Sequence, residues 1–133
     1  MVLERILIVE DNPFFLKFLK EALHSRFPSI EILEAAEGAV ALEKIETSSP
    51  DIILMDLRLP GENGLELTKK IKAQHPDIVV VIVTNYDLPE YREAAYQCKV
   101  DHFVTKDTFL KMIQSVITEQ NIDEAHRNRK LSH

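Results

Sequence analysis

Short apolar runs alternate with longer amphipathic stretches along most of the chain. A continuous run of β-branched and other apolar residues is typical of a strand buried on both faces of a parallel sheet. The second run instead alternates apolar and acidic residues, which predicts a strand nearer the edge of the sheet. The predicted strands are Arg5–Val9, Ile30–Ala35, Ile52–Met55, Ile78–Val83 and His102–Val104.

The stretches that follow these runs place apolar residues three and four positions apart, which is the spacing of an amphipathic helix. Turn-forming residues end several of these stretches. The predicted helices are Phe14–Arg26, a helix from Gly38 to the break at Ser48, Leu65–Gln74, Pro89–Gln97 and Thr108–Gln120. The core-facing residues expected in the first helix are Phe15, Phe18, Leu19, Ala22 and Leu23.

Repeated units of strand then helix predict an α/β fold with a parallel sheet covered on both faces. Each crossover helix must pack back onto the sheet to connect two parallel strands. A chain of 133 residues, 45% of them hydrophobic, suits a single domain. We assign residues 1–120 to this domain and residues 121–133 to a polar tail or the start of a linker.

Charge and cysteine content exclude several classes of protein. The formal net charge of -6 disfavours nonspecific binding to nucleic acid or to an anionic membrane surface. The single cysteine, Cys98, cannot form an internal disulfide, and no Cys/His cluster indicates zinc. The apolar run near the N-terminus is too short for a signal peptide or a membrane span, so we expect a cytoplasmic protein.

The residues at the strand ends carry the candidate chemistry, because open α/β sheets bind ligands beyond the carboxyl ends of their strands. The first strand runs into Glu10 and Asp11, and the third into Asp56. The fourth ends on Thr84, and Lys106 follows the fifth. Three carboxylates, one hydroxyl and one ammonium group are therefore expected at the same edge of the sheet.

Three neighbouring carboxylates repel one another, so a divalent cation such as Mg²⁺ would compensate their charge. Lys106 could pair with Asp56 at rest and with a phosphoryl group when one arrives. The Thr84 hydroxyl could donate to a phosphoryl oxygen. Asp56 follows the strand nearest the middle of the sheet, so it is the best candidate nucleophile, and carboxylates do form aspartyl-phosphate intermediates.

Taken in order, these pieces resemble the receiver domains of two-component response regulators, the CheY-like family. The motifs that carry the resemblance are ILIVEDN, Asp56 through Pro60 with Gly64, VIVTN, and Phe103 through Lys106. The resemblance covers the whole predicted globular part. It implies a flavodoxin-like three-layer sandwich with five helices and a five-stranded parallel sheet of order 2-1-3-4-5.

The resemblance also implies roles for the site residues. Mg²⁺ (or Mn²⁺) would be held by Glu10, Asp11, Asp56 and the backbone carbonyl of Arg58. Asp56 would accept the phosphoryl group, and Lys106 would contact it. Thr84 and Phe103 would act as a switch pair, in which Thr84 moves toward the phosphoryl group and the aromatic ring turns inward behind it.

The implied partners are a histidine kinase or a histidine phosphotransfer protein. Such a chain is no enzyme but an acceptor that promotes its own phosphorylation and slow autodephosphorylation. The surface of the fourth helix, fifth strand and fifth helix is the family's usual output face and the place for a homodimer contact. The family docks its phosphodonor near the first helix, where Phe14 is a candidate docking aromatic; simple packing of Phe14 on neighbouring loops is the alternative.

The chain departs from the family pattern at several of these positions. Glu10 stands where Asp is commoner, which moves the carboxylate by one methylene group. Asp107 replaces the proline that often follows the lysine, so we predict a trans peptide bond there. Asn85 stands where a small residue is favoured and narrows access to the site. Long side chains at Arg58 and Tyr86 are expected to shield the acyl phosphate from water.

Two readings from other classes stay open. A pseudo-receiver would use the same fold as a binding module without phosphorylation, and Asn85 and Asp107 keep that reading alive. A phosphohydrolase of the haloacid dehalogenase type also uses a strand-end aspartate and Mg²⁺, but it needs an acid where Arg58 stands. A dinucleotide-binding fold is the weakest alternative, because no glycine-rich phosphate loop follows the first strand.

Overall fold

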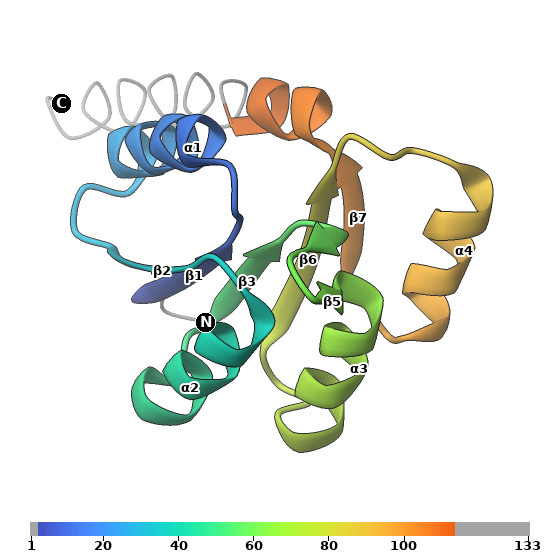
Figure 1. Ribbon diagram of the computed structural model, residues 1–133. Coiled ribbons are helices and arrows are strands. Elements are labelled where there is room, and N and C mark those ends of the chain that lie inside the picture. The colour runs from blue at the N-terminus through green and yellow to red at the C-terminus, as the bar shows by residue number, and fades with distance from the viewer. Residues whose placement is uncertain (1–2, 114–133) are drawn as a thin grey trace, which may run out of the picture.

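A five-stranded parallel sheet forms the centre of the computed structural model, which describes residues 3–113 (Figure 1). Its strand order is β2-β1-β3-β6-β7, which is the predicted order 2-1-3-4-5 of the flavodoxin-like fold. Each predicted strand is found to within one residue at either end. The strands are β1 Arg5–Val9, β2 Glu31–Ala35, β3 Ile52–Met55, β6 Val79–Thr84 and β7 His102–Thr105.

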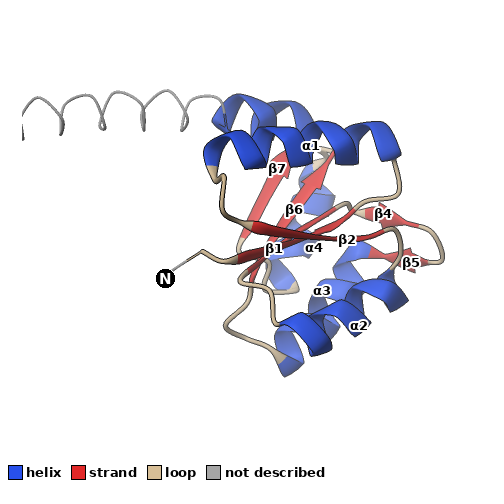
Figure 2. Cartoon of the chain, turned by 90° about the vertical axis from the view of Figure 1, so that its left-hand side faces the viewer, coloured by secondary structure: helices blue, strands red, loops and turns tan. Residues whose placement is uncertain are grey.

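The helices form two outer layers, with α1 on one face of the sheet and α2, α3 and α4 on the other (Figure 2). They are α1 Pro13–Arg26, α2 Gly38–Ser48, α3 Gly64–Gln74 and α4 Pro89–Gln97. A further helical stretch begins at Lys106, two residues before the predicted start, and reaches Ile113 beside α1. The rest of the predicted helix Thr108–Gln120 and the expected domain boundary at residue 120 lie outside the described residues.

Each face of the sheet has its own apolar core. Leu7 and Val9 pack toward α2 and α3, where Leu67 and Ile71 are fully buried. Residues of the opposite parity pack toward α1 and the stretch after β7. This alternation follows from the period of two along a strand, and it explains why the central strands read as continuous apolar runs. Within residues 3–113, no helix is long and apolar enough to cross a membrane.

The core-facing prediction for α1 is wrong at Phe18, whose side chain is 53% exposed. Leu19 and Leu23 are buried as expected, and Phe15 and Ala22 are half-buried. Successive helical positions differ by about 100°, so Phe18 lies a quarter turn from Leu19 and at the rim of the buried face. The sheet and the neighbouring helical stretch cover a narrower arc of α1 than its apolar residues occupy.

The connection after β3 contains a small hairpin that the apolar pattern does not reveal. Arg58–Leu59 (β4) pairs antiparallel with Glu62–Asn63 (β5), and Gly61 turns the chain with a φ of 71°. Gly64 then starts α3 against the loop: a Cβ atom there would lie 2.4 Å from the carbonyl oxygen of Asp56. The glycine thus permits the close packing that holds the segment after Asp56 in place.

Candidate functional site

The structure gathers the predicted site residues at the carboxyl end of the sheet. Glu10 and Asp11 follow β1, and Asp56 follows β3. Thr84 is the last residue of β6, and Lys106 follows β7. Carboxylate oxygens of Glu10, Asp11 and Asp56 all lie within 4.8 Å of one another. Parallel strands bring their carboxyl ends to one edge, and the short connections place these side chains together.

Asn12 and Pro13 fix the chain directly after the first two acids. The Asn12 side-chain oxygen accepts hydrogen bonds from the backbone N–H groups of Phe14 and Phe15, at 3.0 and 3.2 Å. Pro13 occupies the first position of α1, where no N–H donor is needed. The cap forces a sharp change from strand to helix, so that Glu10 and Asp11 stand at the turn, with Glu10 buried and Asp11 exposed.

Lys106 bridges two of the acids. Its Nζ lies 2.5 Å from Glu10 Oε1 and 3.1 Å from Asp56 Oδ2. The three side chains are only 12%, 3% and 11% exposed, so water screens these charges poorly. The predicted resting pair of Lys106 and Asp56 is therefore present, and Glu10 is a second partner that the sequence did not indicate. The peptide bond that follows Lys106 is trans as predicted, since the described residues contain no cis bond.

Glu10 is the least satisfied charge of the cluster. Burial raises the pKa of its carboxyl group to about 7; Lys106 opposes the shift, and the nearby Asp56 adds to it. Burial also acts against the Lys106 charge, but hydrogen bonding to Glu10 and the charge of Asp56 outweigh it, so the pKa of Lys106 is raised. Glu10 Oε2 is buried and has no hydrogen-bond partner among the described residues. One ammonium group thus leaves this acid incompletely compensated.

The donor set of the cluster fits a hard divalent cation. Mg²⁺ binds oxygen ligands at 2.0–2.1 Å, so oxygens on opposite sides of the ion are about 4.2 Å apart. The three acids each present an oxygen within 4.8 Å of the other two, and Glu10 Oε2 has no hydrogen-bond partner among the described residues. Asp11 is exposed, which leaves the cluster open to solvent on one side. Glu10, Asp11 and Asp56 could therefore hold Mg²⁺ or Mn²⁺.

Thr84 and Phe103 both lie buried behind the cluster. The Thr84 hydroxyl accepts a hydrogen bond of 3.2 Å from the Tyr86 backbone N–H. Phe103 is 2% exposed, and its ring already points into the core beside α4. Arg92 of α4 binds it from outside: its guanidinium donates to the Phe103 carbonyl at 2.9 Å and lies 4.9 Å from the ring centre.

The side chains of Arg58 and Tyr86 contact each other. The Arg58 guanidinium lies 3.9 Å from the centre of the Tyr86 ring, at cation–π distance. The Arg58 backbone N–H approaches Asp56 Oδ1 at 3.4 Å, so the backbone of Arg58 lies next to the acid. Asn85, between Thr84 and Tyr86, is exposed. The sequence predicted that Arg58 and Tyr86 flank the site but not that they contact each other.

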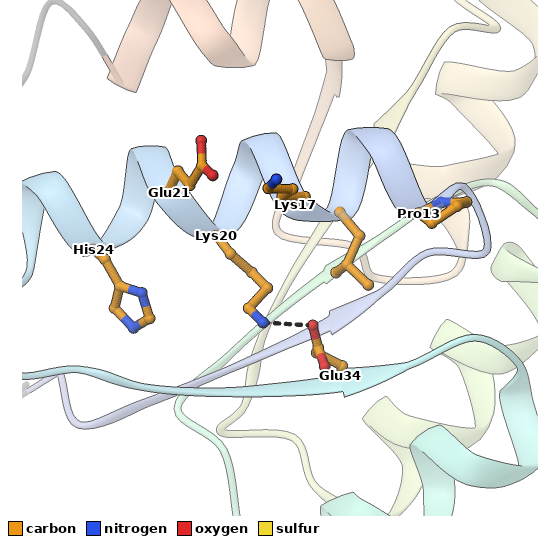
Figure 3. Close-up of a pocket in the computed structure, with 7 residues that line it drawn as sticks. Pro13, Lys17, Lys20, Glu21, His24 and Glu34 are labelled. Atoms are coloured by element: carbon orange, nitrogen blue, oxygen red, sulfur yellow. Dashed lines mark ion pairs between the residues drawn. The ribbon is translucent and has the colours of Figure 1, made fainter.

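Away from the acidic cluster, a hollow of about 370 Å³ lies between α1 and the edge strand β2 (Figure 3). None of the side chains that line it belongs to the acidic cluster. Lys20 points across it to Glu34, with 2.8 Å between Lys20 Nζ and Glu34 Oε1. Side chains of both charges line this hollow. Because Lys20 is already paired with Glu34, the hollow offers no defined ligand site.

Sequence reasoning missed the site contacts that cross between elements. Phe15 was expected only to fill the core, yet its ring lies 4.4 Å from Lys106 Nζ. Arg92 was part of a polar helix without a role, yet it contacts Phe103. Periodicity shows which face of an element is buried, but it does not show which side chain on another element that face meets.

Comparisons with known proteins agree with this geometry. Residues 6–118 match the family described as response regulator receiver domain. A cyclic di-GMP phosphodiesterase of Thermotoga maritima is 34% identical over 124 residues, which are 93% of this chain and 31% of that protein. The curated relatives are longer: the chain spans between 24% and 53% of the length of eight of them.

Two solved structures illustrate the similarity. The Mn²⁺-bound form of response regulator Rcp1 is 26% identical with a TM-score of 0.74, covering 85% of this chain and 91% of that one. The phosphorylated cyanobacterial phytochrome response regulator RcpA is 26% identical with a TM-score of 0.77, covering 90% of this chain and 92% of that one. The Mn²⁺ ion and the phosphoryl group belong to those two proteins.

Proposed function

The chain belongs to the response regulator receiver domain family, and on this premise we propose that Asp56 accepts a phosphoryl group from a histidine kinase or a histidine phosphotransfer protein. The observation that carries the proposal is the placing of one ammonium group between two buried acids, with Asp11 beside them. Asp56 is the member of this cluster that Lys106 and the Arg58 backbone both approach.

The transfer would proceed at a carboxylate oxygen of Asp56. That oxygen attacks phosphorus, and the bond from phosphorus to the donor histidine nitrogen breaks. The electron pair of the broken bond stays on the imidazole, which takes up a proton from solvent. Lys106 then balances the phosphoryl charge, and the Thr84 hydroxyl donates to a phosphoryl oxygen.

We assign the cation site to Glu10, Asp11, Asp56 and the Arg58 backbone carbonyl. Mg²⁺ (or Mn²⁺) bound there would neutralise charge that builds up as the phosphoryl group approaches three acids. The spacing of the acids and the unpartnered Glu10 oxygen support this assignment. The Mn²⁺-bound relative supports it from a similar chain.

Signalling would follow from a change behind the acceptor. When Thr84 turns toward the phosphoryl group, its hydrogen bond with the Tyr86 N–H is lost and the loop before α4 is released. Phe103 then secures the rearranged face of α4, β7 and the helical stretch after β7. Tyr96 of α4 is about half exposed, at 49%, and would serve an output contact or a homodimer.

Phe14 is the proposed docking residue for the phosphodonor. It is 85% exposed and lies at the start of α1, three positions after Asp11. Packing on neighbouring loops, the alternative role, leaves a side chain far less exposed than this. A shallow aromatic contact here would orient the donor histidine over Asp56.

We propose that Arg58 and Tyr86 shield the acyl phosphate from water. Their side chains contact each other, and Arg58 follows Asp56 by two residues, so on this proposal the pair would restrict the approach of water to the acceptor. A dehalogenase-type phosphohydrolase needs an acid where Arg58 stands, so we propose a long-lived phosphoacceptor, not an enzyme that turns over. A cytoplasmic location, without direct binding of nucleic acid, completes the proposal.

The function can be tested with acetyl phosphate, a small donor that needs no partner protein. In the presence of Mg²⁺, intact-mass measurement should show one added phosphoryl group on the parent and none on Asp56→Asn. Addition of a chelator should prevent the modification. A parent that stays unmodified with Mg²⁺ would favour the pseudo-receiver, and modification of Asp56→Asn would place the acceptor elsewhere.

A further inference from the structure

Lys106 has an aromatic neighbour in addition to its two acids. Its Nζ lies 4.4 Å from the centre of the Phe15 ring, within cation–π range. Glu10 and Asp56 are the oxygen partners of the same ammonium group. Two carboxylates and one ring face therefore define where the ammonium group sits.

The position of Phe15 is fixed by its own backbone and by its packing. It lies in the first turn of α1, and its N–H donates to the Asn12 side chain at 3.2 Å. Its ring is half-buried and packs against the core between α1 and the sheet. With Glu10 and Asp56 it also lines a narrow space of about 10 Å³, which is at the limit of what one water molecule needs.

An aromatic ring constrains a lysine differently from an aliphatic side chain. The ring face attracts the ammonium group but offers no strong hydrogen-bond acceptor, so the N–H groups remain directed at oxygen atoms. The ring also keeps water from competing for those N–H groups, which strengthens the interactions in a site of low exposure. A leucine would preserve much of the packing but not the attraction.

We propose that Phe15 is a positioning residue that holds the Lys106 ammonium group at Asp56 for phosphoryl transfer. The inference rests on the proposed function of Asp56 and adds a residue outside the acids, the hydroxyl and the lysine. Loss of the ring should slow phosphorylation by acetyl phosphate about three- to tenfold, the range expected for a cation–π contact of modest strength.

The chain offers a matched control on the same helix. Phe15→Leu removes the ring at Lys106, whereas Phe18→Leu removes a ring that is 53% exposed and makes no cation–π contact within the described part of the chain. Two further proteins would carry mono- and trifluorinated phenylalanine at position 15, which keep the shape of the ring but weaken its negative face. Thermal melts would check that each variant is folded.

Two readouts separate positioning from packing. Proton NMR of the Lys106 methylene groups next to Nζ should show an upfield ring-current shift in the parent and in Phe18→Leu, but not in Phe15→Leu. The acetyl phosphate rate should fall stepwise from phenylalanine to the mono- and then the trifluorinated ring. If Phe15→Leu does not fold, the fluorinated series decides the question.

Equal rates along the fluorinated series, or an unshifted Lys106 signal in the parent, would overturn the role of Phe15. These failures differ from failure of the proposed function. If the parent takes up no phosphoryl group, the acceptor assignment is wrong, and the inference falls with it. If the parent is phosphorylated and Phe15→Leu matches it, only the role of Phe15 is wrong.

Discussion

Acidic side chains lie at both ends of the parallel sheet, but their environments shift their pKa values in opposite directions. At the amino end, Asp51 Oδ2 accepts from the backbone N–H groups of Glu4 and Arg5 at 2.8 and 2.9 Å. These bonds, the one from Arg5 foremost, lower the pKa of Asp51. Asp101 accepts from the Val80 N–H at 2.8 Å, and its Oδ2 lies 2.6 Å from Lys72 Nζ.

Asp101 shows how a structural acid is stabilised. Burial acts to raise its pKa, but the Lys72 and Val80 hydrogen bonds outweigh burial and hold the pKa below its ordinary value. At the carboxyl end, the pKa of Glu10 is raised instead, and Glu10 Oε2 has no hydrogen-bond partner among the described residues. Acids that are satisfied within the fold tie strands together, whereas the acids at the carboxyl end repel one another, which is the arrangement we propose for binding a cation and a phosphoryl group.

The pH dependence of stability should separate the two ends most strongly. Glu10 titrates near 4.5 when unperturbed and about 7 in the folded protein. Between these values the folded protein keeps a proton that the unfolded chain releases, so stability declines as pH rises from about 4.5 to about 7. The full effect is on the order of 3 kcal/mol, and it should be visible in urea unfolding without metal.

Glu10→Gln is the variant that isolates this effect, because it removes the titrating group and nearly keeps its shape. The variant should be more stable than the parent at pH 8 without metal, and the difference should shrink toward pH 4.5. Mg²⁺ should stabilise the parent more than the variant. Parallel stability profiles for the two proteins across this range would contradict the comparison.

The amino end should respond in the opposite way. Asp101→Ala leaves the Val80 N–H and the Lys72 ammonium group without their acid, which should cost about 2 kcal/mol of unfolding free energy. Phosphorylation by acetyl phosphate should be unchanged per folded molecule, because Asp101 lies at the far end of the sheet. A large loss of phosphorylation in the folded variant would mean that the two ends are not independent.

A smaller effect, on the lifetime of the acyl phosphate, is expected from removing the Arg58 and Tyr86 side chains. In the double variant Arg58→Ala/Tyr86→Ala, the acyl phosphate should decay about fivefold faster, the size expected for loss of an exposed cation–π contact that excludes water. The measurement follows decay after the donor is removed. Decay no faster than in the parent would show that the stacked pair does not shield the site.

The smallest effect concerns docking. Phe14→Ser should slow phosphotransfer from the cognate kinase about threefold, since one shallow aromatic contact is lost. The rate with acetyl phosphate should stay unchanged, because Phe14 does not contact the acids. Undiminished transfer from the kinase would remove Phe14 from the docking surface.

The sequence predicted the parts of the molecule that depend on local pattern. Buried parallel strands require apolar runs, so their limits were found to within one residue, and the acids that follow them fell at one edge. The hairpin at Arg58–Asn63 was not predicted, because strands of two residues are too short to show a periodic pattern. Phe18 fitted the apolar spacing of α1, but only the neighbouring elements decide how wide an arc of that helix is covered.

Side-chain partners from distant parts of the chain could not be predicted in this way. The contact of Phe15 with Lys106 joins residues from opposite ends of the domain, and the stack of Arg58 on Tyr86 joins strand β4 to the loop after β6. Such contacts depend on side-chain direction and on crossover geometry. They shape a site whose main chemical groups the strand ends already revealed.

Binding of beryllofluoride, which stands in for a phosphoryl group on a carboxylate, tests the central claim most directly. Fluorine NMR should show a bound signal for the parent with Mg²⁺ and no bound signal after chelation. Asp101→Ala should keep the signal and Asp56→Asn should lose it, which would place the site at the carboxyl end. A parent that shows no bound signal with Mg²⁺, or an Asp56→Asn variant that retains it, would contradict the account.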